Sequence, residues 1–337
     1  MAIRTIDDIS LFNIANAIRS KNGSTDTYKP NQMAAAISNI PVGADWVANM
    51  VEAHWMFLNN DNATGFGNAQ PTWTSLKNGE NMMREAHYWQ EDIDWDMPEC
   101  TNAAGMFQRC GCPNVQSGYQ LPGFKIKINF PKVQTLSQFC LETSYEFPAV
   151  KEVDLTTSNA LTNLNGAFAG CTMLTKCHIT TVASNVDLYN AFYGCINLED
   201  LQIDTIDLSS CRQIEKTFGN CSKLVSITDI VGNSIGYQMY NVGHAFENCT
   251  LLEDIPLMDL SGITDGNGNR IADIVKGCPN LTDDSLDNLL QSCISSRFTG
   301  TKTLYYLGLR EEDYPTARLE ALPHWTDFTQ AGWSAYS

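Results

Sequence analysis

The segment Ala191-Phe-Tyr-Gly-Cys-Ile-Asn-Leu198 is one of five copies of a single unit in this chain. Each copy has Phe, two residues, Cys, two residues and Leu, with Val in place of Phe in the last copy. The copies are Ala167–Leu174, Ala191–Leu198, Thr217–Leu224, Ala245–Leu252 and Ile274–Leu281. Their cysteines, at positions 171, 195, 221, 249 and 278, follow one another at steps of 24, 26, 28 and 29 residues. Self-similarity at steps of this length predicts a solenoid, in which successive coils of chain stack on one another.

A short apolar alternation follows the Leu of several copies. The alternating residues are Cys177 and Ile179 after Leu174, Leu201 and Ile203 after Leu198, and Ile255 and Leu257 after Leu252. Period-two spacing indicates a β-strand with one buried face. The residues in between, His178, Gln202 and Pro256, are then expected to face outward. Phe and Cys should fill the space behind the strand, because free cysteine behaves as a small buried hydrophobe.

The pattern extends towards the N-terminus in a weaker form. Val150, Val153 and Leu155 keep the strand half of the unit, and the segment 130–133 indicates a shorter coil. The segment 111–115 resembles the segment 277–281. The spacing of Ile93, Trp95 and Met97 predicts the strand of a first coil. These segments predict about eight coils between residues 90 and 281, each burying its apolar face on its neighbours.

The consensus Phe-x-x-Cys-x-x-Leu-x-x-Leu-x-Ile resembles the BspA-like leucine-rich repeat family, and the match covers roughly residues 90–281. The resemblance implies a repeat solenoid of leucine-rich-repeat type, with short parallel β-strands on one face and turns or short helical turns on the other. Members of that family are mostly surface-exposed binding proteins of bacteria and their phages, not enzymes. The chain is therefore expected to be a non-enzymatic protein without a cofactor.

A small helical module is predicted at residues 1–41. Its apolar positions are Leu11, Ile14, Ile18, Met33 and Ile37. The run Ile14-Ala-Asn-Ala-Ile-Arg-Ser-Lys-Asn-Gly, followed by the Met33 helix, resembles a short N-terminal module of phage and prophage tail and fibre proteins. This resemblance implies attachment to other virion proteins or homo-oligomerisation, with a trimer favoured by analogy with fibres. The alternative is an ordinary helix pair that caps the repeats, and residues 42–89 are expected to form a linker and N-terminal cap.

Residues 282–337 are expected to form a mixed C-terminal cap. Thr282-Asp-Asp-Ser285 indicates the N-terminus of a helix whose buried face carries Leu286, Leu289 and Leu290. The segment Thr303–Leu309 is predicted to be a last β-strand. The segments Ser285-Leu-Asp-Asn-Leu-Leu and Ala331-Gly-Trp resemble parts of the C-terminal cap of phage-encoded members of the same repeat family.

Charge and hydropathy argue against several classes of partner. The 337 residues include 38 acidic and 21 basic side chains, so the formal net charge is −17. Nucleic-acid phosphates and anionic membrane surfaces both attract clustered Lys and Arg, so neither is an expected partner. No run of 18 apolar residues is present, and the first residues lack the features of a secretory signal. The chain is therefore expected to be made in a bacterial cytoplasm and assembled into a virion there, unless a signal has been removed.

The 12 cysteines indicate core packing. Five of them recur at one repeat position, and that regularity favours packing over a disulfide framework. Cys110-Gly-Cys112 has no second pair at zinc spacing, so a zinc site is not predicted.

The sequence does not complete a calcium-binding loop or any of the common catalytic motifs. Asp265-Gly-Asn-Gly-Asn269 begins like a calcium loop, but Arg270 and Lys276 stand where an EF-hand needs Gly and Glu. The sequence contains no recognisable catalytic triad, phosphate-binding loop or paired carboxylates of glycosidase type. Neither a metal site nor an enzyme is predicted.

The candidate binding surface is the outer face of the strands. Its predicted residues are Asp154, His178, Gln202 and Thr228, with Pro256 at the equivalent position further on. Varied polar side chains on a long solenoid suit a glycan or a peptide. The expected function is that of a phage virion structural protein, of fibre, tail or head-decoration type, that adheres to a bacterial surface or glycan. The alternative is a bacterial surface or secreted adhesin of the same repeat type.

Overall fold

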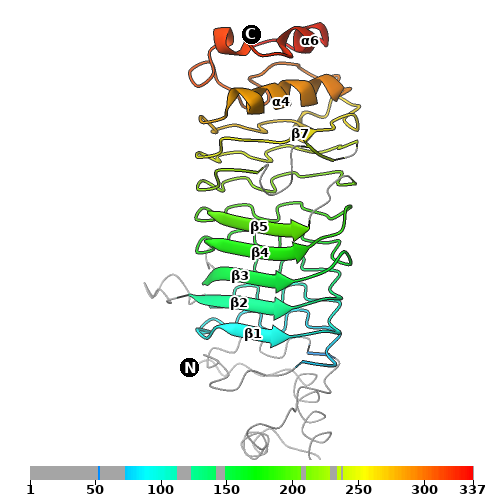
Figure 1. Ribbon diagram of the computed structural model, residues 1–337, viewed down its shortest axis with the longest axis vertical. Coiled ribbons are helices and arrows are strands. Elements are labelled where there is room, and N and C mark those ends of the chain that lie inside the picture. Colours follow the sequence, from blue (N-terminus) through cyan, green and yellow to red (C-terminus); the bar gives the residue numbers. More distant parts are fainter. Residues whose placement is uncertain are drawn as a thin grey trace, which may run out of the picture.

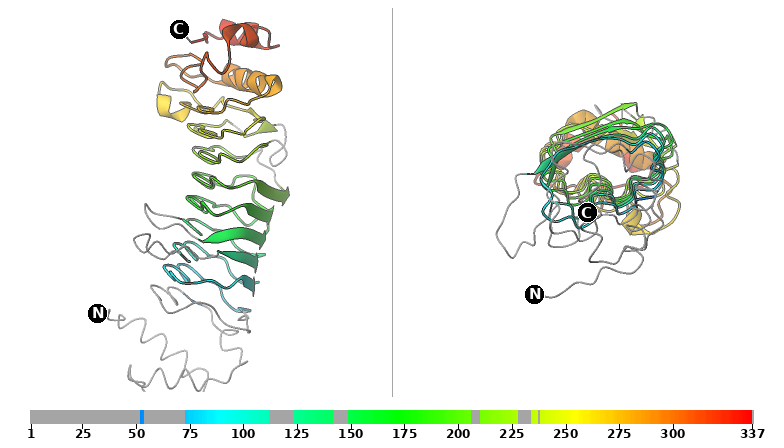
Figure 2. Two further views of the ribbon diagram at one scale, coloured as in Figure 1. Left: turned by 90° about the vertical axis from the view of Figure 1, so that its left-hand side faces the viewer. Right: turned by 90° about the horizontal axis from the view of Figure 1, so that it is seen from below.

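The protein is described here from a computed structural model of the chain. The residues that the structure describes are 52–53, 73–111, 123–141, 149–205, 210–227, 234–236 and 238–336. The predicted N-terminal module, with Leu11, Ile14, Ile18, Met33 and Ile37, lies outside them, as does Thr228. The described chain winds into turns that stack along one long axis, and helices cover its C-terminal end (Figure 1). Seen along that axis, successive turns overlie one another (Figure 2).

One face of this stack is a parallel β-sheet. Its strands are β1 (Ile93–Asp96), β2 (Phe124–Asn129), β3 (Val150–Thr156), β4 (Lys176–Thr181) and β5 (Asp200–Thr205), in the order β1-β2-β3-β4-β5. Every pair is parallel, so each strand lies beside the strand of the next turn of chain. Further along, β6 (Ser234–Ile235) pairs with β7 (Leu257–Met258), also in parallel. The predicted parallel sheet is confirmed, whereas its assignment to the leucine-rich-repeat class stays a prediction.

The alternation of buried and outward residues agrees with the predicted strands. In β4, Cys177 and Ile179 are buried on either side of His178, and they pair in register with Leu201 and Ile203 of β5. The first strand at Ile93 also forms, as β1. Strand β2 was not predicted, although Phe124, Ile126 and Ile128 have the same period-two pattern, with all three side chains buried.

A stack of phenylalanine rings fills the space behind the sheet. Phe168, Phe192, Phe218 and Phe246 come from four successive copies of the repeat and are 0–4% exposed. Ring centroids are 5.3 Å apart for Phe168–Phe192 and 5.9 Å apart for both Phe192–Phe218 and Phe218–Phe246, within the range of favourable aromatic pairs. The rings of the last two pairs lie within 1–2° of parallel. The repeated Phe is therefore the core residue that joins each turn to the next.

The repeated cysteine is a buried hydrogen-bond donor. Each thiol donates to the carbonyl of a residue in the preceding turn, with Cys221 Sγ 3.1 Å from the oxygen of Phe192 and Cys249 Sγ 3.0 Å from that of Phe218. Burial raises the pKa of the Cys221 thiol to about 12. The 11 cysteines among the described residues are free and buried, which confirms core packing for them, while Cys112 lies outside these residues.

Two columns of left-handed backbone run along the stack. The first, with φ between 53° and 61°, contains Asn81, Gly105, Gln138, Gly166, Asn190, Lys216, His244 and Asp273. The second lies four residues later in each turn, has φ between 56° and 77°, and contains Glu85, Arg109, Gly170, Gly194, Asn220, Asn248 and Gly277. Amides of these residues donate to carbonyls of the next turn, as from Gly194 to Gly219 at 2.8 Å. The sharp corners of the turns thus favour Gly and Asn, which make up nine of these 15 residues and adopt positive φ most readily.

Two predictions near the C-terminal end are wrong. Pro256 is buried, because helix α4 (Asp283–Ser295) lies where the next strand would be. The hydroxyls of Ser285 and Ser292 accept from the amides of Ile255 and Met258, at 3.1 and 2.8 Å. The proline ring is therefore covered and cannot bind a ligand from the sheet face.

The segment Thr303–Leu309 is a turn and not a strand. The amides of Tyr306, Leu307 and Gly308 bond to carbonyls three residues earlier in the same segment. The carbonyls of Tyr306 and Leu307 accept hydrogen bonds from the backbone amides of Asp273 and Val275. The segment therefore stacks on the corner that contains Asp273. The only strand-like pairing within 303–309 is the isolated parallel bridge from Thr303 to Ser334.

Helices close the C-terminal end, and the one predicted after Thr282 is confirmed as α4. The buried face of α4 carries Leu286, Leu289 and Leu290, and the short helices α5 (Thr316–Leu319) and α6 (Trp325–Gln330) follow. A 3₁₀ helix, η2 (Gly268–Arg270), lies at an outer corner before α4. Tyr314 anchors the cap, because its hydroxyl donates to the Cys278 carbonyl and accepts from the Leu281 amide. The apolar edge of the last repeat is thereby covered.

Replacing Thr282 with alanine is expected to lower the free energy of unfolding by about 1 kcal/mol, since it removes the N-cap of α4. The Thr282 side chain accepts a hydrogen bond from the Ser285 amide at 3.3 Å. Urea denaturation of the full chain measures the loss. Thr282→Ser keeps the acceptor oxygen and should retain most of the stability, and an equal loss in both variants would contradict a capping role.

Candidate functional site

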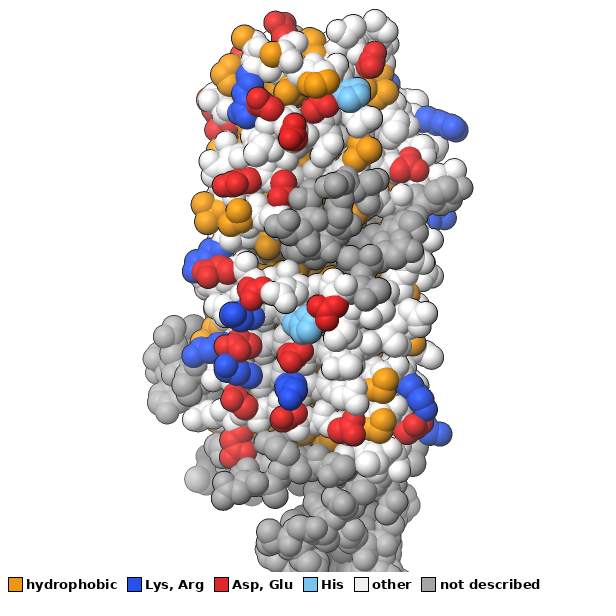
Figure 3. Space-filling model, viewed as in Figure 1, with side chains coloured by type: hydrophobic (Ala, Val, Ile, Leu, Met, Phe, Trp, Pro, Cys, Tyr) orange, Lys and Arg blue, Asp and Glu red, His pale blue; other side chains and the backbone are white. Residues whose placement is uncertain are grey.

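The candidate site is the outer face of β1–β5. Outward side chains alternate with buried ones along most of each strand, with an interruption at Lys151 and Glu152 of β3 where the register shifts. The strand register therefore arranges the outward side chains in rows that cross the sheet. Acidic and basic side chains alternate across this face (Figure 3). The rows, rather than any single residue, are the repeating feature of the surface.

The first row crosses four strands with alternating charge. Lys125, Glu152, Lys176 and Asp200 stand opposite one another in register on β2, β3, β4 and β5. Lys125 Nζ lies 2.8 Å from Glu152 Oε2, and Lys176 Nζ lies 3.2 Å from Asp200 Oδ2. The contact with Glu152 raises the pKa of Lys125. Each lysine thus has its counter-charge on the neighbouring turn of chain.

The second row contains three of the predicted site residues. Asp94, Lys127, Asp154, His178 and Gln202 follow one another in register from β1 to β5. Lys127 Nζ lies 3.6 Å from Asp94 Oδ2, and His178 Nδ1 lies 2.9 Å from Asp154 Oδ1. The predictions that Asp154, His178 and Gln202 share one face and that they are outward are confirmed, whereas their binding role stays a prediction.

His178 also contacts an acidic residue outside these two rows. Its Nε2 lies 2.8 Å from Oδ2 of Asp204, which is two residues beyond Gln202 on the same side of β5. The contact with Asp204 raises the pKa of His178, partial burial lowers it, and Asp154 raises it again, so that the pKa is raised overall. From the sequence alone, Asp204 is expected only to be a solvated acid. The period-two spacing from Gln202 was the signal that could have placed it in the site.

These contacts shape the face more than they stabilise the fold. The lysine side chains of the two rows are 54–63% exposed, and exposed ion pairs contribute about 0–1 kcal/mol each. An open depression of about 290 Å³ lies over β2–β5 and is lined by the side chains of both rows. The surface therefore offers many donors and acceptors whose pairs can be rearranged at low cost by a polar ligand.

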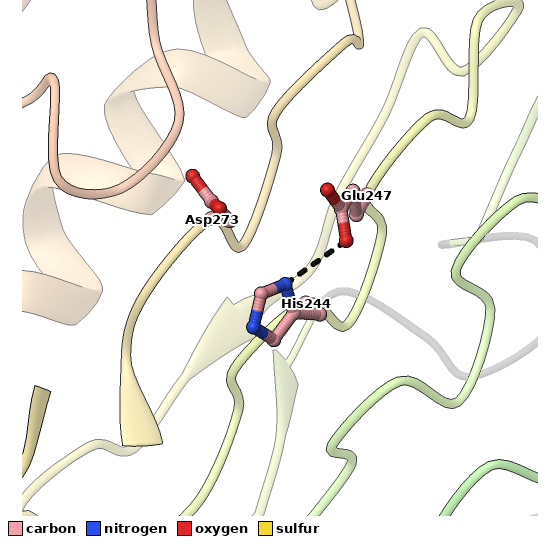
Figure 4. A group of neighbouring side chains, drawn as sticks. All are labelled: His244, Glu247 and Asp273. Carbon is pink, nitrogen blue, oxygen red and sulfur yellow. Dashed lines mark hydrogen bonds and ion pairs between the residues drawn. The ribbon is translucent and has the colours of Figure 1, made fainter. Parts of the chain in front are cut away.

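A second group of polar residues, His244, Glu247 and Asp273, lies at an outer corner of the stack (Figure 4). The Nδ1 atom of His244 is 2.9 Å from Glu247 Oε2. The ammonium of Lys276 is 2.9 Å from Glu247 and 3.1 Å from Asp273. Burial raises the pKa of Glu247, but hydrogen bonds from Lys276 and His244 outweigh it and the pKa is lowered. These residue types could ligate a metal, yet Lys276 supplies the positive charge between the two carboxylates, so the group is an ion network.

The rejected calcium motif is also accounted for. Asp265 accepts from the Asn267 amide at 3.1 Å and forms an ion pair of 3.0 Å with Arg270. Its carboxylate therefore organises a corner turn.

The comparisons with known proteins do not extend these observations. No family model matches the chain, and no match was found among curated proteins or among solved structures. Within the described residues, no helix has the length and apolar character needed to span a membrane.

Proposed function

We propose that this chain is a phage virion protein, of fibre, tail or head-decoration type, whose leucine-rich-repeat solenoid adheres to a bacterial surface or a glycan through the outer face of β1–β5. The observation that carries this proposal is the long face of paired polar side chains on successive turns. The resemblances at residues 14–37 and in the C-terminal segment support its virion part. Other virion proteins are the proposed partners of residues 1–41, and the proposed assembly is a homo-oligomer with three copies favoured.

The leucine-rich-repeat part of the proposal is supported by agreement between sequence and contacts. The repeated Phe forms one stack, and the repeated Cys donates to the preceding turn. The residue before the repeated Cys has a left-handed backbone in each of the five copies. Stability in such an arrangement comes from each turn and its contacts with its neighbours, so the outward face is free to vary and to bind.

A non-enzymatic role is supported by the surroundings of His178. A general base needs a ring nitrogen within hydrogen-bond reach of the proton that it removes. Both ring nitrogens of His178 face carboxylates, at 2.9 Å from Asp154 and 2.8 Å from Asp204. Neither nitrogen is directed at a hydroxyl or thiol that could act as a nucleophile, so the arrangement fits recognition better than catalysis.

Replacing Gln202 with tryptophan is expected to abolish adhesion, because an indole at this exposed position of β5 would cover the depression between the rows. The full chain would be incubated with a panel of bacterial cells and with surface glycans isolated from them, and retention would be measured. Thr326→Trp is the matched control, since Thr326 is exposed on α6, far along the stack from the sheet. Retention that is equal in both variants, or absent for the unaltered chain, would contradict adhesion through this face. Absence of the protein from purified virions would contradict the virion part.

A further inference from the structure

His178 joins three successive turns of the stack. It lies on β4. Its Nδ1 is hydrogen-bonded to Asp154 of β3, and its Nε2 lies at the ion-pair distance of 2.8 Å from Asp204 of β5, although this second contact lacks the angle of a hydrogen bond. Asp154 and Asp204 belong to strands that are not themselves neighbours in the sheet. Among the strands of the described residues, β5 is the last of the five-stranded sheet and pairs with β4. The contacts of His178 therefore link the last three of these strands.

The other charged groups around His178 are already engaged elsewhere. Lys176, on the same strand, pairs with Asp200 of β5, and Glu152 of β3 pairs with Lys125 of β2. Lys127 of β2 stands opposite Asp154 in register, but its ion pair is with Asp94 of β1. Among the ion pairs of the described residues, those of Asp154 and Asp204 are both made with His178. The positive charge that holds these two carboxylates together is thus the imidazolium.

We propose that His178 is a proton-dependent clasp: the imidazolium ties β5 to β3 through Asp204 and Asp154, and loss of its proton releases the edge of the sheet. A neutral imidazole carries one N–H, so it can donate to one of the two carboxylates but not to both. The other carboxylate then faces a ring nitrogen with a lone pair, which repels it. The clasp stands on this geometry and does not depend on the proposed adhesion.

The direction of the pH effect follows from the contacts. Asp204 raises the pKa of His178 and burial lowers it, while Asp154 raises it further, so the pKa in the folded chain lies above the ordinary value of 6.5. A group whose folded pKa is raised stabilises the fold fully below its unfolded pKa. That contribution is lost as the pH rises through the folded pKa. The clasp is therefore closed below the unfolded pKa of histidine, about 6.5, and it opens as the pH rises through the folded pKa of His178.

An NMR titration of the His178 ring in the full chain tests the clasp. The midpoint is expected above 6.5 in the unaltered protein and should fall in Asp204→Asn, and by less in Asp154→Asn, since the Asp204 contact has the larger effect. Asp200→Asn is the matched control, because Asp200 is an outward carboxylate of the same strand whose partner is Lys176. It should leave the midpoint close to that of the unaltered protein. A midpoint at or below 6.5, or equal midpoints in the Asp204 and Asp200 variants, would overturn the proposal.

A stability measurement reports on the clasp independently. His178→Gln should lower the melting temperature relative to the unaltered chain at pH 5.5. The difference between the two proteins should shrink at a pH above the midpoint that the NMR titration gives for His178. A difference that is the same at both pH values would show that the side chain acts by packing alone and would also overturn the proposal.

Discussion

Replacing Phe192 with alanine is expected to lower the free energy of unfolding by about 3–5 kcal/mol, since truncation of a buried aromatic ring leaves a cavity that the core fills only in part. Phe192 is fully buried and lies between Phe168 and Phe218, at centroid distances of 5.3 and 5.9 Å. The loss should be large because the ring contributes to two interfaces between turns at once, and a stack of repeats is stabilised chiefly through such interfaces. Urea denaturation followed by circular dichroism measures it.

Ile196→Ala is the matched control for Phe192. Ile196 belongs to the same turn of chain and is also a large apolar residue, but it is 43% exposed. Its truncation should change the free energy of unfolding by about 0.5 kcal/mol or less, as is usual for surface positions. Similar losses in the two variants would mean that the Phe stack is not the element that joins the turns.

Much of the sheet could be predicted because its signal is local. The alternation of Cys177 and Ile179 around His178 is contained in three consecutive residues and requires no knowledge of the neighbours. β2 was missed because the segment 111–115 was aligned with the repeat through Cys112, whereas the matching unit is Phe107-Gln-Arg-Cys110. Residues 111–123 separate Cys110 from β2, against residues 172–175 between Cys171 and β4. The segment Thr303–Leu309 has apolar residues like those of a strand, but its amides bond within the segment. That choice depends on contacts with Asp273 and Val275 in the preceding turn, which local spacing does not encode.

The candidate site was predictable as a face but not as a set of contacts. Asp154, His178 and Gln202 were expected to point outward, and the register places them side by side. The partner Asp204 lies diagonally across β5, so its contact with His178 depends on side-chain reach as well as on register. The steps between repeated cysteines vary from 24 to 29 residues, so pairings between turns cannot be counted off from sequence positions.

The residue before each repeated cysteine is a further sequence signal, because it marks a corner of the stack. The residue before the repeated cysteine is Gly170, Gly194, Asn220, Asn248 or Gly277, and all five have positive φ. Only Gly adopts this conformation freely, and Asn tolerates it better than most other residues. A position that alternates between Gly and Asn therefore indicates a left-handed backbone, and this pattern of residue types is enough to locate the corner of each turn along the chain.

Gly194→Val is expected to lower the free energy of unfolding by about 1–3 kcal/mol, because a β-branched residue is strained in the left-handed region. The Gly194 backbone has φ of 77°, and its amide donates to the Gly219 carbonyl at 2.8 Å, so the conformation is held by the stack. A Cβ at this position would come no closer than 3.7 Å to the atoms of Gly170. Space is therefore available for the Cβ, and the loss is expected to arise from the backbone conformation. Thermal and urea denaturation of the full chain both measure it.

Gly194→Asn separates this explanation from a general intolerance of side chains. Asn occupies the same position in the next two turns, at Asn220 and Asn248, with φ of 62° and 60°. The asparagine variant should therefore lose less than about 1 kcal/mol, since Asn adopts left-handed backbone readily and also restricts the unfolded chain more than Gly does. Equal losses for the valine and asparagine variants would mean that bulk at the corner, and not the left-handed backbone, selects the residue there. A large loss for valine alone would establish that the left-handed backbone, and not bulk, selects the residue at this corner of the stack.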